Sequence, residues 1–155
     1  MIYLNKGYIM LAKIHTLSKD ILQNFQSLSL LLARLAVAYG FLEPALNKWS
    51  NMKGTADFFG SIDIPFPMIN AYMAATTELL GVILLTIGLL TRLISVPLMV
   101  VMIVAITTVH LCHGFSAGNN GFEIPLYYFL FLFIFTAHGA GKFSLDHYLF
   151  EKEKK

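Results

Sequence analysis

The stretch ISVPLMVVMIVAITTVHL, residues 94–111, carries no formal charge and is long enough to cross a lipid bilayer as a helix. A helix rises about 1.5 Å per residue, so about 20 residues cross a hydrocarbon core about 30 Å thick. Three other long apolar runs lie at residues 28–48, 67–90 and 122–140. The whole chain is 57% hydrophobic and only 13% charged, which is far from the composition of a soluble domain.

These four runs predict an all-α membrane protein built as a bundle of four transmembrane helices. A backbone exposed to lipid must satisfy its own hydrogen bonds, and no run alternates apolar and polar residues as a barrel strand does. We expect one transmembrane domain at residues 28–141, with an outer-facing loop or short helix between the first two spans. An amphipathic segment at 1–27 precedes this domain, and a charged tail at 142–155 follows it.

The segment before the first run has the periodicity of an amphipathic helix. Its apolar residues recur at spacings of three, four or seven, and they are Met10, Ile14, Leu17, Ile21 and Leu28. Such a helix can lie along the cytoplasmic membrane interface, or it can pack as a buried helix beneath the bundle. We do not expect a secretory signal, because Lys13, Lys19 and Asp20 interrupt the segment and no small-residue cleavage site follows it.

The basic residues outside the runs predict the orientation of the chain. Eight of them fall on one side of the membrane: Lys6, Lys13, Lys19, Arg92, Lys142, Lys152, Lys154 and Lys155. Only Lys48 and Lys53 fall on the other side. The positive-inside rule therefore predicts that both termini lie in the cytoplasm.

The segment between the first two runs lies on the predicted outer side and is rich in aromatic residues. Thr55 can cap a short helix that carries Phe58 and Phe59, and the corner Pro65-Phe66-Pro67 returns the chain to the membrane. These aromatic residues fit two interpretations. They can form the usual aromatic belt of a membrane interface, or a lid over a lipophilic ligand such as a quinone.

Arg34 and Glu78 are charged residues within the first two runs. A charge at the membrane centre costs about 3 kcal/mol on insertion scales, so we expect both side chains to face the bundle interior. Their depths are roughly 9 Å for Arg34 and roughly 18 Å for Glu78, and the long arginine side chain can cover much of this gap. We therefore expect the two side chains to share one polar network. They are the catalytic candidates, with Glu78 as proton acceptor or ligand anchor and Arg34 holding its charge. A purely structural ion pair is the alternative.

Four titratable residues fall at the predicted outer end of the bundle, namely Glu43, His110, His113 and Glu123. Imidazole and carboxylate groups can act as general acids and bases, so such a set can exchange protons during quinone chemistry. We take Glu43, His110 and Glu123 as candidate cofactor-binding residues. The plainer alternative is that they are ordinary residues at helix ends, where a first-turn carboxylate such as Glu123 is favoured by the helix dipole.

The triplet of His110, Cys112 and His113 places two imidazoles and a thiol within one helical turn, and all three are acceptable copper ligands. Its spacing matches no recognised metal site, so copper is the weaker interpretation and no metal ligand is assigned.

A stripe of small residues, Ala74, Gly81 and Gly88, allows another helix to approach the second run closely, from the same bundle or from a second chain.

Three segments carry a family resemblance. The stretch ELLGVILLTIGLLTR (78–92) resembles the second-helix signature of the DoxX family of small bacterial membrane proteins. His110 followed by NGFE (120–123) resembles that family's junction between helices three and four, and GAGKFSLD (139–146) resembles its closing motif. The resemblance covers residues 32–149. Many relatives have a His-Gly pair near the end of helix one where this chain has FLEP (41–44), so no role of that histidine is transferred.

This resemblance implies a protein of the bacterial inner membrane with a quinone-linked or redox-coupled role beside a partner protein. The variant motifs look most like DoxX-type proteins found beside genes for copper-chelating ribosomal peptides. The sequence contains no Cys-x-x-Cys, haem-attachment, Rossmann or P-loop motif, so any electrons must come through a partner or a borrowed cofactor. The alternative is a non-catalytic scaffold or escort for a copper-chelating peptide or for soluble antioxidant partners. The net charge of +2 gives no indication of nucleic-acid binding.

Overall fold

The computed structural model describes residues 2–151, apart from the side chains of residues 2–6, 17, 20, 21, 23, 24 and 151. Every regular element in this range is a helix. The main helices are α1 (Ile2–Ser50), α2 (Met52–Ser61), α3 (Pro67–Ile87), α4 (Thr91–Ala105) and α5 (Glu123–His138). Short π and 3-10 turns follow at Ile106–His110, Leu111–His113, Ala117–Asn119 and His147–Glu151.

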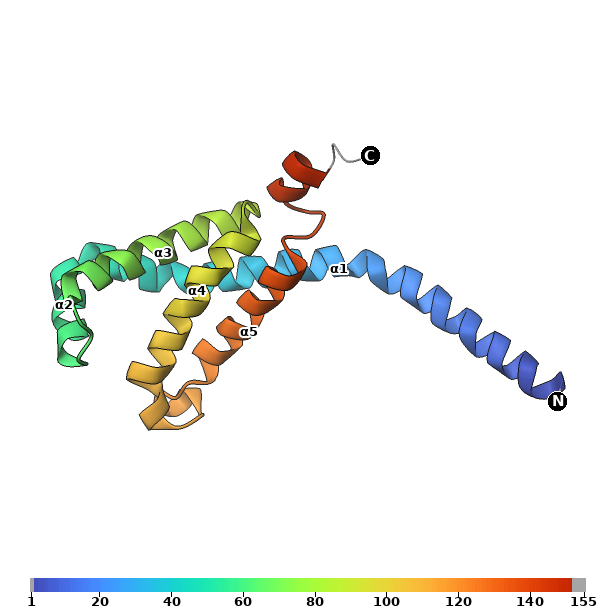
Figure 1. Cartoon of the computed structure of the whole chain (residues 1–155), viewed down its shortest axis with the longest axis horizontal. Helices are drawn as coiled ribbons and strands as arrows, with labels where there is room; N and C mark the ends of the chain where they lie inside the picture. The colour runs from blue at the N-terminus through green and yellow to red at the C-terminus, as the bar shows by residue number, and fades with distance from the viewer. Residues whose placement is uncertain (1, 152–155) are drawn as a thin grey trace.

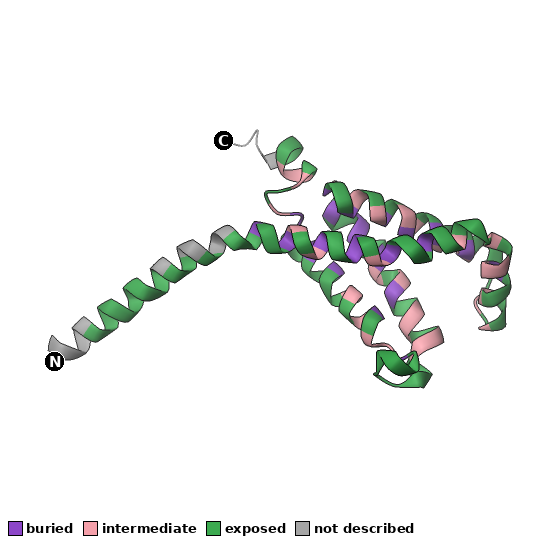
Figure 2. Ribbon diagram, turned by 180° about the vertical axis from the view of Figure 1, so that it is seen from behind, coloured by how far each residue is buried: buried purple, intermediate pink, exposed green. Residues whose placement is uncertain are grey.

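Three helical segments are long and apolar enough to span a membrane: Phe25–Ser50, Pro67–Ile87 and Thr91–His113. Between 22% and 28% of the residues in these windows are buried inside the protein, so most of their apolar surface faces outward, as lipid-facing helices require (Figure 2). The all-helical fold is therefore confirmed, with three helical segments that are candidates to span a membrane. Helix α5 is apolar but has 16 residues, about 24 Å of rise, so the fourth span stays a prediction.

The amphipathic segment is continuous with the first span, because α1 runs without a break from Ile2 to Ser50. Figure 1 shows its amino-terminal part projecting away from the other helices. Met10 and Ile14 are 62% and 55% exposed, so the interpretation of a buried helix beneath the bundle is wrong. The side chains of Leu17 and Ile21 lie outside the described part, as does the tail beyond residue 151.

The helices associate as two pairs, α1 with α3 and α4 with α5, and α3 also contacts α4. The two pairs come together near the turn between α3 and α4, and they diverge toward α2 and the loop that precedes α5 (Figures 1 and 2). The core lies where the pairs meet and contains Val37, Phe41, Leu85, Leu98, Leu132 and Phe135.

The end where the pairs meet, called the clamped end here, is tied together by residues 139–146 and the α3–α4 turn. The carboxylate of Asp146 accepts hydrogen bonds from the backbone N–H groups of Leu90 (2.7 Å) and Thr91 (3.0 Å), which begin α4. A helix start leaves such N–H groups without partners, so this carboxylate caps α4. Arg92 then donates to the carbonyls of Thr136 (3.1 Å) and Ala137 (2.8 Å) near the end of α5.

The glycines of the small-residue stripe pack within this chain. Gly81 is buried, and a Cβ there would lie 2.7 Å from the side chain of Leu98 on α4. Gly88 has a φ of 70°, and a Cβ there would lie 2.5 Å from the Arg34 guanidinium. The interpretation of close packing inside one bundle therefore accounts for both glycines.

Candidate functional site

The divergence of the two helix pairs leaves a cavity of about 500 Å³. Its wall comes from α1, α2, α3, α4, the π turn and α5, and it is mostly apolar. The apolar lining includes Phe41, Pro44, Phe58, Phe59, Met73, Val101, Met102 and Ile124, and the polar lining includes Lys48, Asn70, Thr77, Glu78, Thr108, His110 and Tyr128. Phe58 and Phe59 of α2 thus occupy the place expected of a lid. We call the end of the bundle that holds this cavity, near α2 and the loop before α5, the cavity end.

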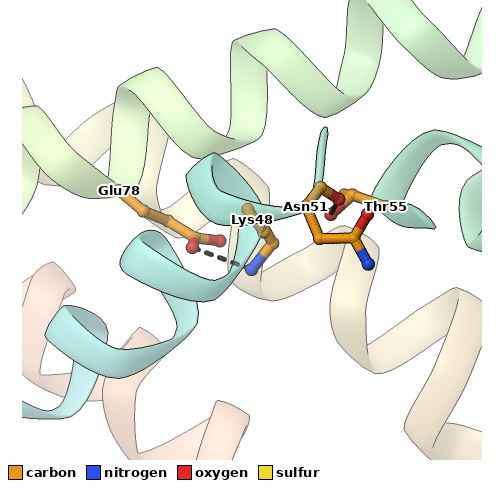
Figure 3. A network of polar contacts seen from close by, with 4 residues as sticks. All are labelled: Lys48, Asn51, Thr55 and Glu78. Carbon is orange, nitrogen blue, oxygen red and sulfur yellow. Dashed lines mark hydrogen bonds and ion pairs between the residues drawn. The ribbon is translucent and has the colours of Figure 1, made fainter. Parts of the chain in front are cut away.

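An ion pair between Lys48 and Glu78 lies in the cavity wall. Lys48 Nζ is 2.8 Å from Glu78 Oε2, and the two side chains are 23% and 3% exposed. Figure 3 shows the two side chains reaching toward each other from the last turns of α1 and the middle of α3. Glu78 is therefore a buried carboxylate that is paired with Lys48. Its side chain lies in the wall of a largely apolar space.

A cap at Asn51 starts α2 three residues after Lys48. Asn51 Oδ1 accepts a hydrogen bond from Gly54 N at 3.0 Å. Thr55 Oγ1 donates to Asn51 O at 3.1 Å (Figure 3). These bonds start α2 immediately after α1 ends at Ser50. Thr55, which the sequence suggested as the cap, bonds instead to the backbone of the actual cap, Asn51.

Tyr128 completes the cavity wall from α5. Its ring packs against Phe41 with ring centroids 5.4 Å apart. Gly40 makes this approach feasible, because a Cβ at that position would collide with the Tyr128 hydroxyl. Tyr128 was not predicted as a site residue, and Gly40 is the signal that could have indicated a close neighbour on this helix.

His110 enters the wall from the π turn. Its Nδ1 lies 2.8 Å from the carbonyl oxygen of Asn120 on the loop before α5. Among the predicted site residues, Glu78 and His110 therefore line one cavity.

Two predicted residues lie away from the cavity. Glu43 is exposed and is not part of the cavity wall. Glu123 also lies outside the wall: its Oε2 accepts a hydrogen bond from Ala117 N at 3.0 Å, and its Oε1 accepts one from the Tyr127 hydroxyl at 3.3 Å. Glu123 thus orders the loop that carries Asn120.

The predicted network between Arg34 and Glu78 is wrong, although both side chains are buried as expected, at 0% and 2% exposure. Arg34 lies at the clamped end, where Nη1 donates to Leu85 O and Nη2 donates to Phe143 O, each at 2.6 Å. Backbone carbonyls therefore accept from both terminal nitrogens of the guanidinium, whereas its buried Nε has no hydrogen-bond partner among the described residues. Lys48, near the end of α1, is the residue of that helix that lies level with Glu78.

The proposed copper ligands do not converge. His113 Nδ1 lies 3.3 Å from Cys112 Sγ but also 3.0 Å from Val109 O, while His110 is directed to Asn120 O. Within the described residues, no group of three or more His, Cys, Asp or Glu side chains is placed to hold a metal ion. The copper interpretation gains no support from this geometry.

Comparison with known proteins agrees with the resemblance seen in the motifs. The DoxX family model matches residues 29–111. A Bacillus subtilis protein named "Putative oxidoreductase CatD" is 38% identical over 125 residues, which cover 80% of this chain and 89% of that protein. Two Haemophilus influenzae proteins, each named "Uncharacterized protein", are 35% identical over 122 residues (76% of this chain, 81% of the relative) and 31% identical over 145 residues (84% and 98%). No solved structure gives a significant match.

Proposed function

Because this chain belongs to the DoxX family, and a relative carries the name "Putative oxidoreductase CatD", we propose that it is the membrane subunit of a redox system and binds a quinone. The observation that carries this proposal is the Lys48–Glu78 ion pair in the wall of an apolar cavity. A buried ion pair is weak evidence for stability, because its desolvation cost offsets much of its attraction. A pair kept at membrane depth beside a cavity is better explained by a ligand.

The chemistry of the cavity fits a quinone. A quinone combines a flat apolar ring with two carbonyl oxygens, and ligand sites typically pair an apolar lining with a few polar groups in a volume of about 300–1,000 Å³. The cavity volume of about 500 Å³ falls in this range. Phe58, Phe59 and Met73 suit the ring and its lipid tail, and the Lys48 ammonium can donate a hydrogen bond to a carbonyl oxygen.

Conversion between quinol and quinone moves two electrons and two protons. In the oxidising direction, both quinol O–H bonds break: one proton passes to the Glu78 carboxylate, the other passes to a second proton acceptor, and the two electrons pass to a redox centre on a partner protein. In the reducing direction, the same partner supplies two electrons, Glu78 returns one proton and the second group returns the other. Lys48 stabilises the charged form of Glu78 in both directions, while the partner is required because the sequence has no redox motif of its own.

We also propose that the protein lies in the bacterial inner membrane with four spans, α5 being the fourth, and with both termini in the cytoplasm. The uneven distribution of basic residues supports this orientation. The exposed residues Met10 and Ile14 support a position of the amino-terminal arm along the cytoplasmic interface. In this orientation, the cavity end faces the outer side.

The experiment is a binding measurement on the full chain in lipid nanodiscs. A short-chain benzoquinone should bind in stoichiometric amounts, and lipid extraction of the purified protein should recover native quinone. Glu78→Gln removes the carboxylate that accepts from a quinol hydroxyl, so it should weaken binding of the corresponding quinol about tenfold, the factor for roughly one charge-assisted hydrogen bond. Glu43→Gln, which changes an exposed carboxylate outside the cavity, is the matched control and should bind as the unmodified protein does. Absence of quinone from both assays would overturn the proposal.

A further inference from the structure

We infer that His110 is the second proton-exchanging residue of this cavity and that its Nε2 atom accepts or donates the proton. The inference rests on the proposed quinone site and deepens it, because Glu78 accounts for only one of the two protons. His110 lines the same cavity as the Lys48–Glu78 pair but belongs to a different helix segment. The two groups can therefore address different oxygens of one ligand.

The contact with Asn120 determines the chemical state of the ring. A backbone carbonyl oxygen only accepts hydrogen bonds, so the Nδ1 atom that lies 2.8 Å from Asn120 O must carry a proton. In the neutral ring, Nε2 is then a bare acceptor that can take a proton from a quinol hydroxyl. In the charged ring, Nε2 carries a proton and can donate it to a quinone carbonyl oxygen.

The fold builds this contact from both sides. On the side of α4, the chain forms a π turn at Ile106–His110, in which Leu111 N donates to Ile106 O, and such turns occur frequently at functional sites. On the other side, Glu123 holds Ala117 N, and Gly121 N donates to Ser116 O at 2.9 Å. A Cβ on Gly121 would collide with the backbone of residues 114 and 115, so this tight loop, which presents Asn120 O, needs glycine there.

The proton and electron counts then balance. When a quinol is oxidised, one hydroxyl gives its proton to Glu78, the other gives its proton to His110 Nε2, and two electrons pass to the partner's redox centre. Lys48, Glu78 and Tyr128 are the other charged or titratable groups of the cavity wall, and Glu123 lies on the loop beyond it. His110 is next to that exposed loop, so its proton can leave to water.

The test compares the affinity for a benzoquinone with the affinity for its quinol, on the full chain in nanodiscs. Measurements run between about pH 5 and 8, where histidine side chains change charge. As the pH rises, quinone binding should weaken and quinol binding should tighten, each by about threefold to tenfold, because Nε2 changes from donor to acceptor. Opposite slopes for the two ligands are the signature of this inference.

Two variants separate His110 from its surroundings. His110→Gln keeps a side chain that donates and accepts at all these pH values, so both slopes should flatten while binding persists. His113→Gln changes a neighbouring histidine outside the cavity wall and should keep both slopes. Persistent slopes in His110→Gln, or flat slopes in the unmodified protein, would overturn the role of His110 and leave the quinone site standing. Failure of the unmodified protein to bind either ligand would overturn both.

Discussion

The two ends of the bundle treat buried charge in different ways. At the clamped end, Arg34 is fully buried and both of its terminal nitrogens are bound to backbone carbonyls of other segments. At the cavity end, Lys48 and Glu78 pair with each other in the wall of an apolar space. A charge satisfied by fixed carbonyls can only hold helices together, whereas a charge pair beside a cavity can exchange one of its partners for a ligand.

This difference assigns a task to each end. The Asp146 carboxylate and Arg92 fasten the start of α4 and the end of α5 near Arg34, so the clamped end fixes how the helix pairs meet. The pairs can then stay apart at the cavity end without separating altogether. Changes at the clamped end should therefore lower stability, and changes at the cavity end should mainly alter ligand binding.

The largest expected effect is that of Arg34→Met. The variant removes two charge-assisted hydrogen bonds and leaves the carbonyls of Leu85 and Phe143 without these donors, so the free energy of unfolding should fall by roughly 3–5 kcal/mol. Unfolding in mixed detergent micelles measures this loss. Arg34→Lys is the control, and its single ammonium should recover only part of the stability. An Arg34→Met protein as stable as the unmodified chain would remove the distinction between the two ends.

The burial of Arg34 and Glu78 could be predicted from sequence, but their partners could not. The cost of a lipid-exposed charge requires both side chains to face inward, and this holds wherever the neighbouring helices lie. A pairing depends on which residues are level with each other across two helices. Lys48 was counted with the outer charges, whereas the structure places it on α1 beside Glu78.

Neither the continuity of α1 nor the existence of the cavity could be predicted from the sequence. The change from an amphipathic to a wholly apolar pattern near Leu28 suggested two segments, but nothing in the backbone breaks there, so one helix carries both patterns. The cavity results from the angle between the helix pairs, and that angle is set by contacts at the clamped end that are remote in sequence, such as Arg34 with Phe143. The outer aromatic residues Phe58 and Phe59, and the candidates Glu78 and His110, indicated a site at this end without its shape.

Single and double substitutions of Lys48 and Glu78 test whether this ion pair stabilises the fold or serves a ligand. Lys48→Met leaves Glu78 buried without its basic partner and should lower the free energy of unfolding by about 2 kcal/mol. The double variant Lys48→Met with Glu78→Leu replaces the pair by apolar side chains and should regain most of that stability, yet bind no quinone above background. Unfolding and binding are measured on the same preparations. A double variant as unstable as Lys48→Met alone would mean that the pair serves the fold and not a ligand.

Asp146→Ala tests the clamped end with a smaller perturbation. Loss of the cap on Leu90 N and Thr91 N should cost about 1 kcal/mol of unfolding free energy. Quinone affinity should stay within about twofold, because neither Asp146 nor its hydrogen-bond partners Gly88, Leu90 and Thr91 belong to the cavity wall. Asp146→Asn retains an oxygen acceptor and is the control. A tenfold loss of affinity in Asp146→Ala would show that the two ends are coupled.

The smallest effect is expected at the loop before α5. Glu123→Ala removes the acceptor for Ala117 N and so loosens the segment that presents Asn120 O to His110. The carboxylate bond lies at the surface, so the free energy of unfolding should fall by no more than about 0.5–1 kcal/mol. A weaker contact between His110 Nδ1 and Asn120 O keeps the proton on Nδ1 for less of the time, so Nε2 is a proton acceptor for less of the time. Quinol affinity near pH 8 should therefore fall about twofold to threefold. Quinone affinity near pH 5 should change less. Glu123→Gln keeps an oxygen for Ala117 N and should restore the quinol affinity. Equal losses for quinol and quinone at every pH would mean that Glu123 affects the shape of the cavity and not the proton position on His110.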